Sequence, residues 1–251
     1  MKIVGQTDKG ITRRSNQDSF AVLQLATGLD AVVLCDGMGG AQAGNVASDQ
    51  AVSIISNHIS RFARVDMRSQ SIKALLESSA MAANAQIYDQ SQTHLELSGM
   101  GTTVVSAIFL NGVAHIIHAG DSRAYILKNG VLEQITTDHS IVQHLYETGQ
   151  ITKEEALNHP TRNVITRAVG TQDTLKVDYN MVDYADGDMF LICSDGLTNF
   201  VSEEQIQEII QENDFFDAAK KLVDKANENG GGDNITVVLA LADSEEDEAS
   251  L

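Results

Sequence analysis

An apolar run ends in Asp-Gly twice in this sequence, as Val32-Val33-Leu34-Cys35-Asp36-Gly37 and as Leu191-Ile192-Cys193-Ser194-Asp195-Gly196. Apolar residues at consecutive positions, rather than at every second one, are typical of strands buried on both faces. Runs at residues 20–25, 31–35, 189–193 and 235–242 predict strands, several of them of this kind. Such strands require an apolar layer on either side of a sheet.

Two Asn-Gly pairs predict hairpins. Asn111-Gly112 separates apolar runs at residues 103–110 and 113–118, and Asn129-Gly130 separates runs at 124–128 and 131–135. Asn-Gly favours a type I′ turn, because both central residues need positive φ. The two hairpins follow each other directly, so the sequence predicts an antiparallel meander.

Helical spacing of apolar residues predicts two pairs of helices outside the strands. The first pair carries Val52, Ile55 and Ile59 on one face, and then an apolar stripe from residue 72 to 87. The second begins at Ser202 with a capping box and continues through the stripe at 218–226. A helix pair, many strands and a second helix pair predict a layered α+β sandwich.

The composition is that of a globular chain. It has 251 residues, 43% hydrophobic and 21% charged, which excludes disorder and coiled coil as the main architecture. No linker divides it, so we expect one domain over residues 1–242, with an excursion of short helices and loop at about 140–167. Residues 243–251, DSEEDEASL, carry five acidic side chains and predict a disordered tail.

Charge and targeting signals restrict the partners. Lys+Arg 17 against Asp+Glu 35 gives a net charge of −18, which repels nucleic acid and anionic membranes. The longest uncharged stretch, 97–120, is interrupted by polar residues and falls short of the roughly 20 apolar residues of a membrane span. The N-terminus lacks a signal peptide's apolar core, and two cysteines make no disulfide framework. We expect a cytoplasmic protein.

Five aspartates lie next to predicted strands. Asp36 and Asp195 end the two apolar runs, Asp233 precedes the last strand, Asp18 precedes the strand at 20–25, and Asp121 follows the one ending at 118. Buried carboxylates need a positive partner, and oxygen ligands alone suit Mg²⁺ or Mn²⁺ better than zinc. Asp-Gly is also a common turn dipeptide, so each aspartate taken alone is better explained as a turn residue, and only their repetition after buried apolar runs favours a site.

A series of short motifs, in order and spacing, resembles the metal-dependent type 2C protein phosphatases (the PPM family), and most of all their bacterial serine/threonine branch. The motifs are Arg13-Arg14-Ser15-Asn16-Gln17-Asp18, Asp36-Gly37-Met38-Gly39-Gly40, Gly99-Met100-Gly101-Thr102-Thr103, Ala119-Gly120-Asp121-Ser122-Arg123, His159-Pro160-Thr161-Arg162-Asn163, Ser194-Asp195-Gly196-Leu197 and Gly232-Asp233-Asn234-Ile235-Thr236. Each motif alone is weak, but the ordered series is specific. It spans residues 4 to 241.

The resemblance implies a four-layer α-β-β-α sandwich, in which two antiparallel sheets pack face to face with helix pairs outside. It also implies a dinuclear Mn²⁺/Mg²⁺ centre at one end of the sandwich. By this resemblance Asp36 bridges both ions, Asp195 and Asp233 complete one of them, and the Gly37 carbonyl serves the other.

Further roles are implied by the same resemblance. Asp18 acts indirectly, through water on the metal, and Asp121 with Asp195 matches a third, weaker metal site. Arg13 matches the arginine that grips the substrate phosphate. The excursion at 140–167 matches the family's flap, whose residues Asn163 and Arg167 either contact the substrate or serve the local structure.

The implied reaction is direct attack of metal-activated water on phosphorus. A histidine follows the Asp-Gly in animal relatives, whereas Met38 stands here, so the proton donor is unassigned and metal-bound water is preferred over His159. His159 is expected instead to bond within its loop. His115 and His118 lie three residues apart on a predicted strand and point to opposite faces, which argues against a shared metal.

The leading hypothesis is therefore a monomeric protein serine/threonine phosphatase that acts on phosphorylated proteins and opposes bacterial-type serine/threonine kinases. Two alternatives stay open at this point. One is a catalytically silent metal-binding or phosphopeptide-binding module of the same fold, against which the retention of Arg13, Asp36, Asp195 and Asp233 speaks. The other is a metal-dependent hydrolase of small phosphoesters.

Overall fold

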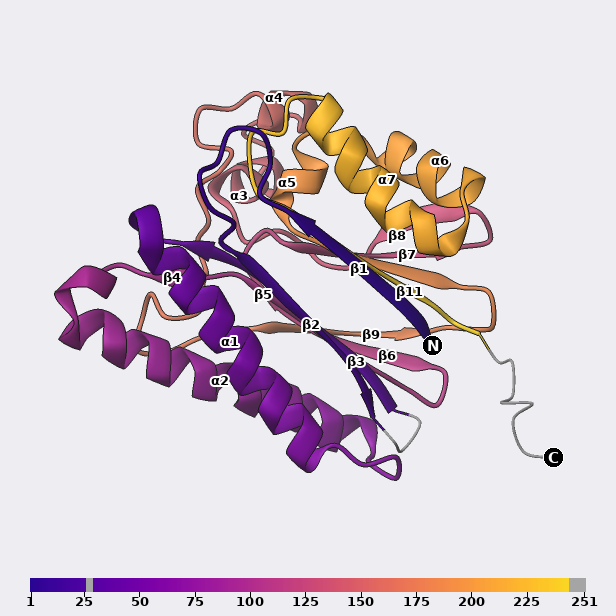
Figure 1. Cartoon of the computed structure of the whole chain (residues 1–251), viewed down its shortest axis with the longest axis horizontal. Coiled ribbons are helices and arrows are strands. Elements are labelled where there is room, and N and C mark those ends of the chain that lie inside the picture. Colours follow the sequence, from indigo (N-terminus) through magenta and orange to yellow (C-terminus); the bar gives the residue numbers. More distant parts are fainter. Residues whose placement is uncertain (26–28, 244–251) are drawn as a thin grey trace.

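The structure, a computed structural model, describes residues 1–25 and 29–243, so all of the expected acidic tail except Asp243 lies outside the described residues. Its strands form two antiparallel sheets (Figure 1). The first sheet has the order β1 (Lys2–Asp8), β11 (Ile235–Leu241), β10 (Met189–Cys193), β7 (Arg123–Lys128) and β8 (Val131–Gln134). The second has the order β2 (Asp18–Leu25), β3 (Leu29–Met38), β5 (Val104–Leu110), β6 (Val113–Ala119) and β9 (Asp178–Asp183), with β4 (Gly101–Thr102) paired to the end of β3.

Helices cover the outer face of each sheet. α1 (Gly40–Phe62) and α2 (Ser69–Thr93), followed by the short η1 (Leu95–Leu97), pack on the second sheet. α6 (Glu203–Glu212) and α7 (Phe215–Glu228) pack on the first, next to the single turn of α5 (Asp195–Thr198). Figure 1 shows these helix pairs on opposite sides of the two sheets. The predicted four-layer α-β-β-α sandwich is confirmed.

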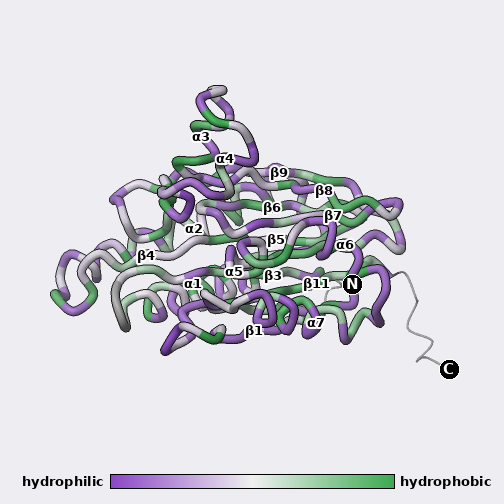
Figure 2. The backbone as a smooth tube through the Cα atoms, turned by 90° about the horizontal axis from the view of Figure 1, so that it is seen from above, coloured by the Kyte–Doolittle hydropathy of each residue, from purple (hydrophilic) through white to green (hydrophobic). Residues whose placement is uncertain are grey.

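Alternate residues of the central strands face different apolar layers. On β3, Val33 and Cys35 pack toward α1 and α2, whereas Val32 and Leu34 join the layer between the sheets. On β10, Leu191 faces α6 and α7. Burial on both faces explains why these strands read as continuous apolar runs. In Figure 2 apolar residues accordingly follow the strands through the interior.

Both hairpins form as predicted. Asn111 and Gly112 have φ of 52° and 76°, and Asn129 and Gly130 have φ of 52° and 80°. The predicted meander is wrong, because β5 and β6 belong to the second sheet and β7 and β8 to the first. The chain crosses between the sheets at Gly120, whose φ of +114° favours glycine. Strands buried on both faces carry no signal for which sheet they join, so the sequence could not show this crossing.

The excursion at 140–167 contains α3 (Ile141–Glu147) and α4 (Lys153–Leu157) and projects beyond the strands in Figure 2. Ser140 caps α3 through Gln143, and Thr152 forms the predicted capping box with Glu155. Among the described residues, none of the helices combines the length and apolar character needed to cross a bilayer.

The inter-sheet layer generates a stability prediction. Phe109 of β5 and Phe190 of β10 are each 1% exposed, and their ring centroids lie 5.0 Å apart across the two sheets. Phe109→Ala should lower the free energy of unfolding by about 3–5 kcal/mol in urea titrations, because it leaves a cavity between the sheets. Phe216→Ala, on a ring that is 62% exposed, is the matched control. Equal losses in the two variants would contradict this view of the core.

Candidate active site

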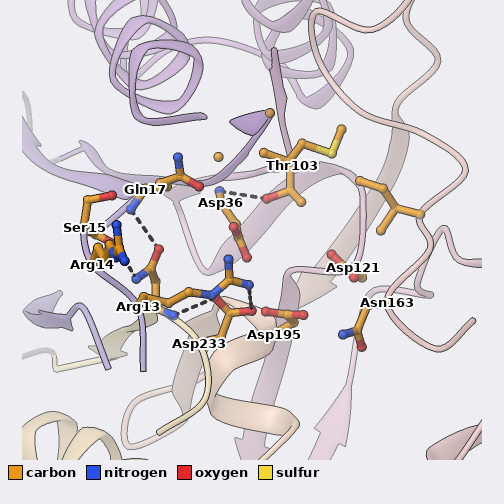
Figure 3. A pocket seen from close by; sticks show the side chains of 15 residues that line it. Arg13, Arg14, Ser15, Gln17, Asp36, Thr103, Asp121, Asn163, Asp195 and Asp233 are labelled. Atoms are coloured by element: carbon orange, nitrogen blue, oxygen red, sulfur yellow. Dashed lines mark hydrogen bonds and ion pairs between the residues drawn. The ribbon is translucent and has the colours of Figure 1, made fainter. Parts of the chain in front are cut away.

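Carboxylates from both sheets meet in one pocket of about 470 Å³ at an end of the sandwich (Figure 3). Asp36, Asp121, Asp195 and Asp233 line it, together with Arg13 and Asn163 at its sides. Asp36 stands near the end of β3, Asp195 two residues after the end of β10, and Asp233 shortly before β11. In Figure 3 these carboxylates point into the same space. The topology therefore brings together side chains up to about two hundred residues apart in the sequence.

The main chain at Asp36 is fixed on both sides. Its N–H donates to Thr103 Oγ1 at 2.9 Å, and its carbonyl accepts from Thr103 N at 2.8 Å and Thr102 Oγ1 at 2.9 Å. At the neighbouring Gly37, an added Cβ would lie 2.1 Å from the Gly44 carbonyl oxygen. Only glycine fits there, so the Asp-Gly pair has a packing reason beyond turn formation.

Asp18 is the register partner of Asp36 on β2 and is buried. Its Oδ2 accepts hydrogen bonds from Ser194 Oγ and Thr236 Oγ1, both at 2.7 Å. Thr236 belongs to β11 and Ser194 directly follows β10, so this carboxylate joins the two sheets. Its Oδ1 is buried and has no hydrogen-bond partner among the described residues.

Asp195 is held in the same way, with one oxygen bonded and one without a partner. Its Oδ2 accepts from Asn199 Nδ2 at 2.9 Å, while its buried Oδ1 has no partner in the part of the chain that the structure describes. At the following Gly196, a Cβ would lie 1.8 Å from the Asn234 carbonyl oxygen. The close approach of these two segments places Asp195 beside Asp233.

Asp233 forms an ion pair with Arg13, whose Nη2 lies 2.7 Å from Oδ2. The Arg13 side chain is 50% exposed, so this pair lies at the rim of the pocket. Asn234 fixes the loop that carries Arg13, because its amide bonds to the main chain of Ser15 and Gln17. The position of Arg13 thus depends on the same segment that supplies Asp233.

Burial sets the protonation of the cluster. Desolvation is the largest cause of the raised pKa of Asp36 and Asp195, both well above the usual value, and neighbouring aspartates raise them further. Burial also raises the pKa of Asp18 and of Asp121 to about 6. Clustered carboxylates with orphaned buried oxygens are a donor set that suits Mg²⁺ or Mn²⁺, and no thiol or imidazole lines the pocket within the described ranges. The residues present fit such ions.

Two further predicted residues occupy different places. Asn163 lines the pocket and lies next to Asp121 in Figure 3. Arg167 is not among the described residues that line it. Its Nη1 lies 2.7 Å from Asp178 Oδ1 and 2.9 Å from His139 Nε2, at the base of the excursion. The structure therefore separates Arg167 from the carboxylates.

Supporting hydroxyls were missed by the sequence analysis. Thr103, Ser194 and Thr236 each contact the backbone or carboxylate of an acidic residue in the site. The same Thr103 hydroxyl lies 2.7 Å from Ser122 Oγ, beside Asp121. All four residues, Thr103, Ser122, Ser194 and Thr236, stand within the sequence motifs. A short polar side chain inside a motif does not show which residue it will contact.

Comparison with known proteins agrees with this geometry. A family model described as protein phosphatase 2C matches residues 11–240. The serine/threonine phosphatase stp of Listeria monocytogenes serotype 4b (strain F2365) is 39% identical over 239 residues, covering 95% of this chain and 94% of that protein. Stp1 from Staphylococcus aureus superposes with a TM-score of 0.89 at 36% identity, covering 96% and 94% of the two chains. The catalytic domain of the serine/threonine protein phosphatase PstP in complex with two manganese ions superposes with a TM-score of 0.83 at 35% identity, covering 96% of this chain and 97% of that chain.

The raised pKa values predict how pH affects the metal-free protein. An aspartate pKa that rises from 3.8 to about 6 on folding gives stability that is complete below pH 4 and is lost as the pH rises through 6. In chelator, the melting temperature should therefore fall between pH 5 and pH 7.5. Asp36→Asn should raise it at pH 7.5 by roughly 2–4 °C per kcal/mol of relieved repulsion.

Differential scanning fluorimetry of wild type and Asp36→Asn at both pH values measures this. The difference between the two proteins isolates the carboxylates, because the lowered pKa of the buried histidines acts in the opposite direction in both. Mn²⁺ should raise the melting temperature of the wild type more than that of the variant. A variant that melts below wild type in chelator at pH 7.5 would contradict the repulsion.

Proposed function

The chain belongs to the protein phosphatase 2C family and is a serine/threonine phosphatase, and we propose that it hydrolyses phosphoserine and phosphothreonine in proteins at the carboxylate pocket. The observation that carries the proposal is the convergence of Asp36, Asp195 and Asp233 from two sheets beside Arg13. An ordinary turn aspartate is solvated. These carboxylates instead share a pocket, and a buried oxygen of Asp195 there lacks a hydrogen-bond partner among the described residues.

We assign the metal ligands as the resemblance implied. Asp36 would serve both of two Mn²⁺ or Mg²⁺ ions, Asp195 and Asp233 would complete one, and the Gly37 carbonyl would serve the other. Asp121 with Asp195 would form a third, weaker site. When bound, such ions lower the pKa of a water molecule and supply the nucleophile that attacks phosphorus. The manganese in the related PstP catalytic domain supports the assignment.

The chain's own side chains bind and orient the substrate. Arg13 offers a planar fork of N–H donors to two phosphoryl oxygens, which orients the group and offsets its charge. Its half-exposed position at the rim suits a group arriving from solvent. Asp18 is not among the described residues that line the pocket, and it would act indirectly from its place beside Asp36. Ser194 and Thr236 hold one of its oxygens, and the other is buried without a partner among the described residues.

The leaving oxygen needs a proton, because an alkoxide leaves poorly. Met38 lines the pocket at the position where animal relatives have histidine. His159 Nδ1 instead lies 2.9 Å from Thr161 Oγ1, so this imidazole bonds within its own loop, as predicted. We assign the proton to water in the pocket.

The proposal extends to the partners. We infer that residues 1–242 act as one catalytic domain and as a monomer, on proteins phosphorylated by bacterial-type serine/threonine kinases. The excursion at 140–167 supports a protein substrate, because it projects next to the pocket and lines it through Asn163. A hydrolase of small phosphoesters needs no such surface, and a silent binding module needs no complete carboxylate set.

Phosphate release from a phosphothreonine peptide tests the function. Purified protein should show turnover with Mn²⁺ and none with chelator, and Asp195→Asn should reduce turnover by about 100-fold or more, because it removes a charged ligand. Asp66→Asn, at an exposed aspartate between α1 and α2, is the matched control and should keep full turnover. Folded protein without turnover in Mn²⁺ or Mg²⁺ would favour the binding module. Faster turnover of a nucleotide than of the peptide would favour the small-phosphoester hydrolase.

Arg13→Lys tests the phosphate fork. Lysine keeps the charge but loses the bidentate geometry, and a hydrogen bond to a charged group contributes about 1.5–3 kcal/mol. The variant should therefore lose roughly 10- to 100-fold in kcat/KM on the phosphopeptide. Arg61→Lys, in the last turn of α1, is the control. Unchanged kcat/KM in Arg13→Lys would remove Arg13 from substrate binding.

A further inference from the structure

Outside the pocket, His139 is bonded to the residue that precedes Asp121. Its main-chain N–H donates to the Gly120 carbonyl at 2.9 Å, and its ring Nδ1 accepts from the Gly120 N–H at 3.2 Å. Both polar groups of the Gly120 backbone are therefore held by one histidine, which is 7% exposed. Buried backbone groups that are paired in this way fix the local chain direction.

The other side of the ring is bonded as well. His139 Nε2 lies 3.2 Å from Asp178 Oδ2, and Arg167 Nη1 lies 2.7 Å from Asp178 Oδ1. Because Nδ1 accepts from Gly120, the neutral ring carries its proton on Nε2 and donates it to Asp178. Arg167 Nη1 also lies 2.9 Å from Nε2, but both nitrogens are donors in this tautomer, so Arg167 acts on the ring only by orienting Asp178. Asp178 thus fixes the tautomer that can accept from Gly120.

Two imidazoles and a carboxylate, those of His118, His139 and Asp178, have ligand atoms within 4.8 Å of one another. We assign no cation to this group. The two rings stack with centroids 4.5 Å apart at 8°, which keeps their lone pairs in separate parallel planes. The Arg167 guanidinium already supplies a positive charge to Asp178. The group serves hydrogen bonding.

Gly120 has little freedom on its other side. An added Cβ there would lie 2.6 Å from Thr103 Cγ2, so the backbone packs directly against Thr103. The Thr103 hydroxyl in turn bonds to Ser122 at 2.7 Å. Asp121 therefore stands between two anchored neighbours, with His139 holding the preceding residue and Thr103 the following one.

We propose that His139 is a positioning residue that orients Asp121 toward a divalent ion by accepting the Gly120 N–H. The proposal rests on the proposed function, in which Asp121 contributes to a weaker metal site. His139 also stands at the neck of the excursion, because its carbonyl accepts from Thr166 N at 2.7 Å and Ser140 bridges to Ile165. One side chain thus connects the neck of the projecting segment to a metal-binding loop.

Two substitutions separate the two ends of the imidazole. In His139→Asn the amide oxygen can take the place of Nδ1 and accept from Gly120, but the contact with Asp178 is lost. In His139→Gln the amide reaches toward Asp178, while the acceptor for Gly120 is lost. If His139 is merely structural, metal binding in both variants should follow their stability. The proposal predicts instead that His139→Asn binds metal like the wild type and that His139→Gln does not.

The first readout is Mn²⁺ binding, measured from the electron paramagnetic resonance signal of the free ion. The second is phosphopeptide turnover as a function of Mn²⁺ concentration. His139→Gln should weaken the weakest Mn²⁺ site about tenfold and shift the turnover curve equally. In an Asp121→Asn background the same substitution should have no further effect, because both changes act on one site. His115→Gln is the matched control, since this 2%-exposed imidazole on β6 bonds to Tyr179 instead.

The outcomes are distinct. The positioning role is established if His139→Gln loses Mn²⁺ affinity and His139→Asn does not. In the Asp121→Asn background, His139→Gln should then cause no further loss. Equal Mn²⁺ binding in wild type and Gln, with Asp121→Asn deficient, overturns it while leaving the metal site intact. An additive loss in the double variant also overturns it, because His139 would then act elsewhere. Absence of turnover in every protein, with the Mn²⁺ differences preserved, would reject the proposed function and not this inference.

Discussion

The structure depends on one electrostatic constraint, the burial of several carboxylates at the end of a two-sheet sandwich. Asp36 loses its hydration and faces Asp18, Asp195 and Asp121, so its ionised form is unfavourable without a cation. The unfavourable free energy of these buried carboxylates lowers the stability of the folded chain. The packing of the strands that carry them compensates for it. A divalent ion of the kind proposed for this pocket would remove the cost on binding, and part of the free energy of metal binding would then be free energy of folding.

The support of the cluster is made almost entirely of neutral donors. Thr102 and Thr103 hold the backbone at Asp36, and the hydroxyls of Ser194 and Thr236 hold Asp18. Hydroxyl donors replace lost water but leave the negative charge in place, whereas a buried lysine or arginine would neutralise it and compete with the ions. The arginines that line the pocket, Arg13 and Arg14, are exposed at its rim instead. The inside of the pocket therefore stays negatively charged. Arg13 and Arg14 remain at its rim, where an incoming anion can replace Asp233 as the partner of Arg13.

Much of this could be predicted from the sequence, and the failures have physical reasons. The Asn-Gly turns, the capping box at Thr152 and the strands buried on both faces are local signals, and all appear. The strands β1 and β9 were missed because they are edge strands, only partly buried, and show no continuous apolar run. The Arg13–Asp233 pair joins residues 220 positions apart, and the Ser194–Asp18 bond residues 176 apart. No pattern along the chain encodes such pairings.

The carboxylates come from different sheets, and this restricts which parts of the sequence can change without moving them. Asp36 belongs to the second sheet and Asp195 follows a strand of the first, so any shift between the sheets would separate them. The packed layer between the sheets therefore keeps the cluster together, and its residues are constrained by the chemistry as well as by stability. The segment at 140–167, in contrast, leaves and returns at a narrow neck. Asn163 and Ile165 of this segment line the pocket. Asp36 and Asp195 are held by Thr103 and Asn199 outside it, so the segment can change in sequence without moving these two carboxylates. The part of the pocket lining that this segment contributes can thus vary separately from the placement of the carboxylates.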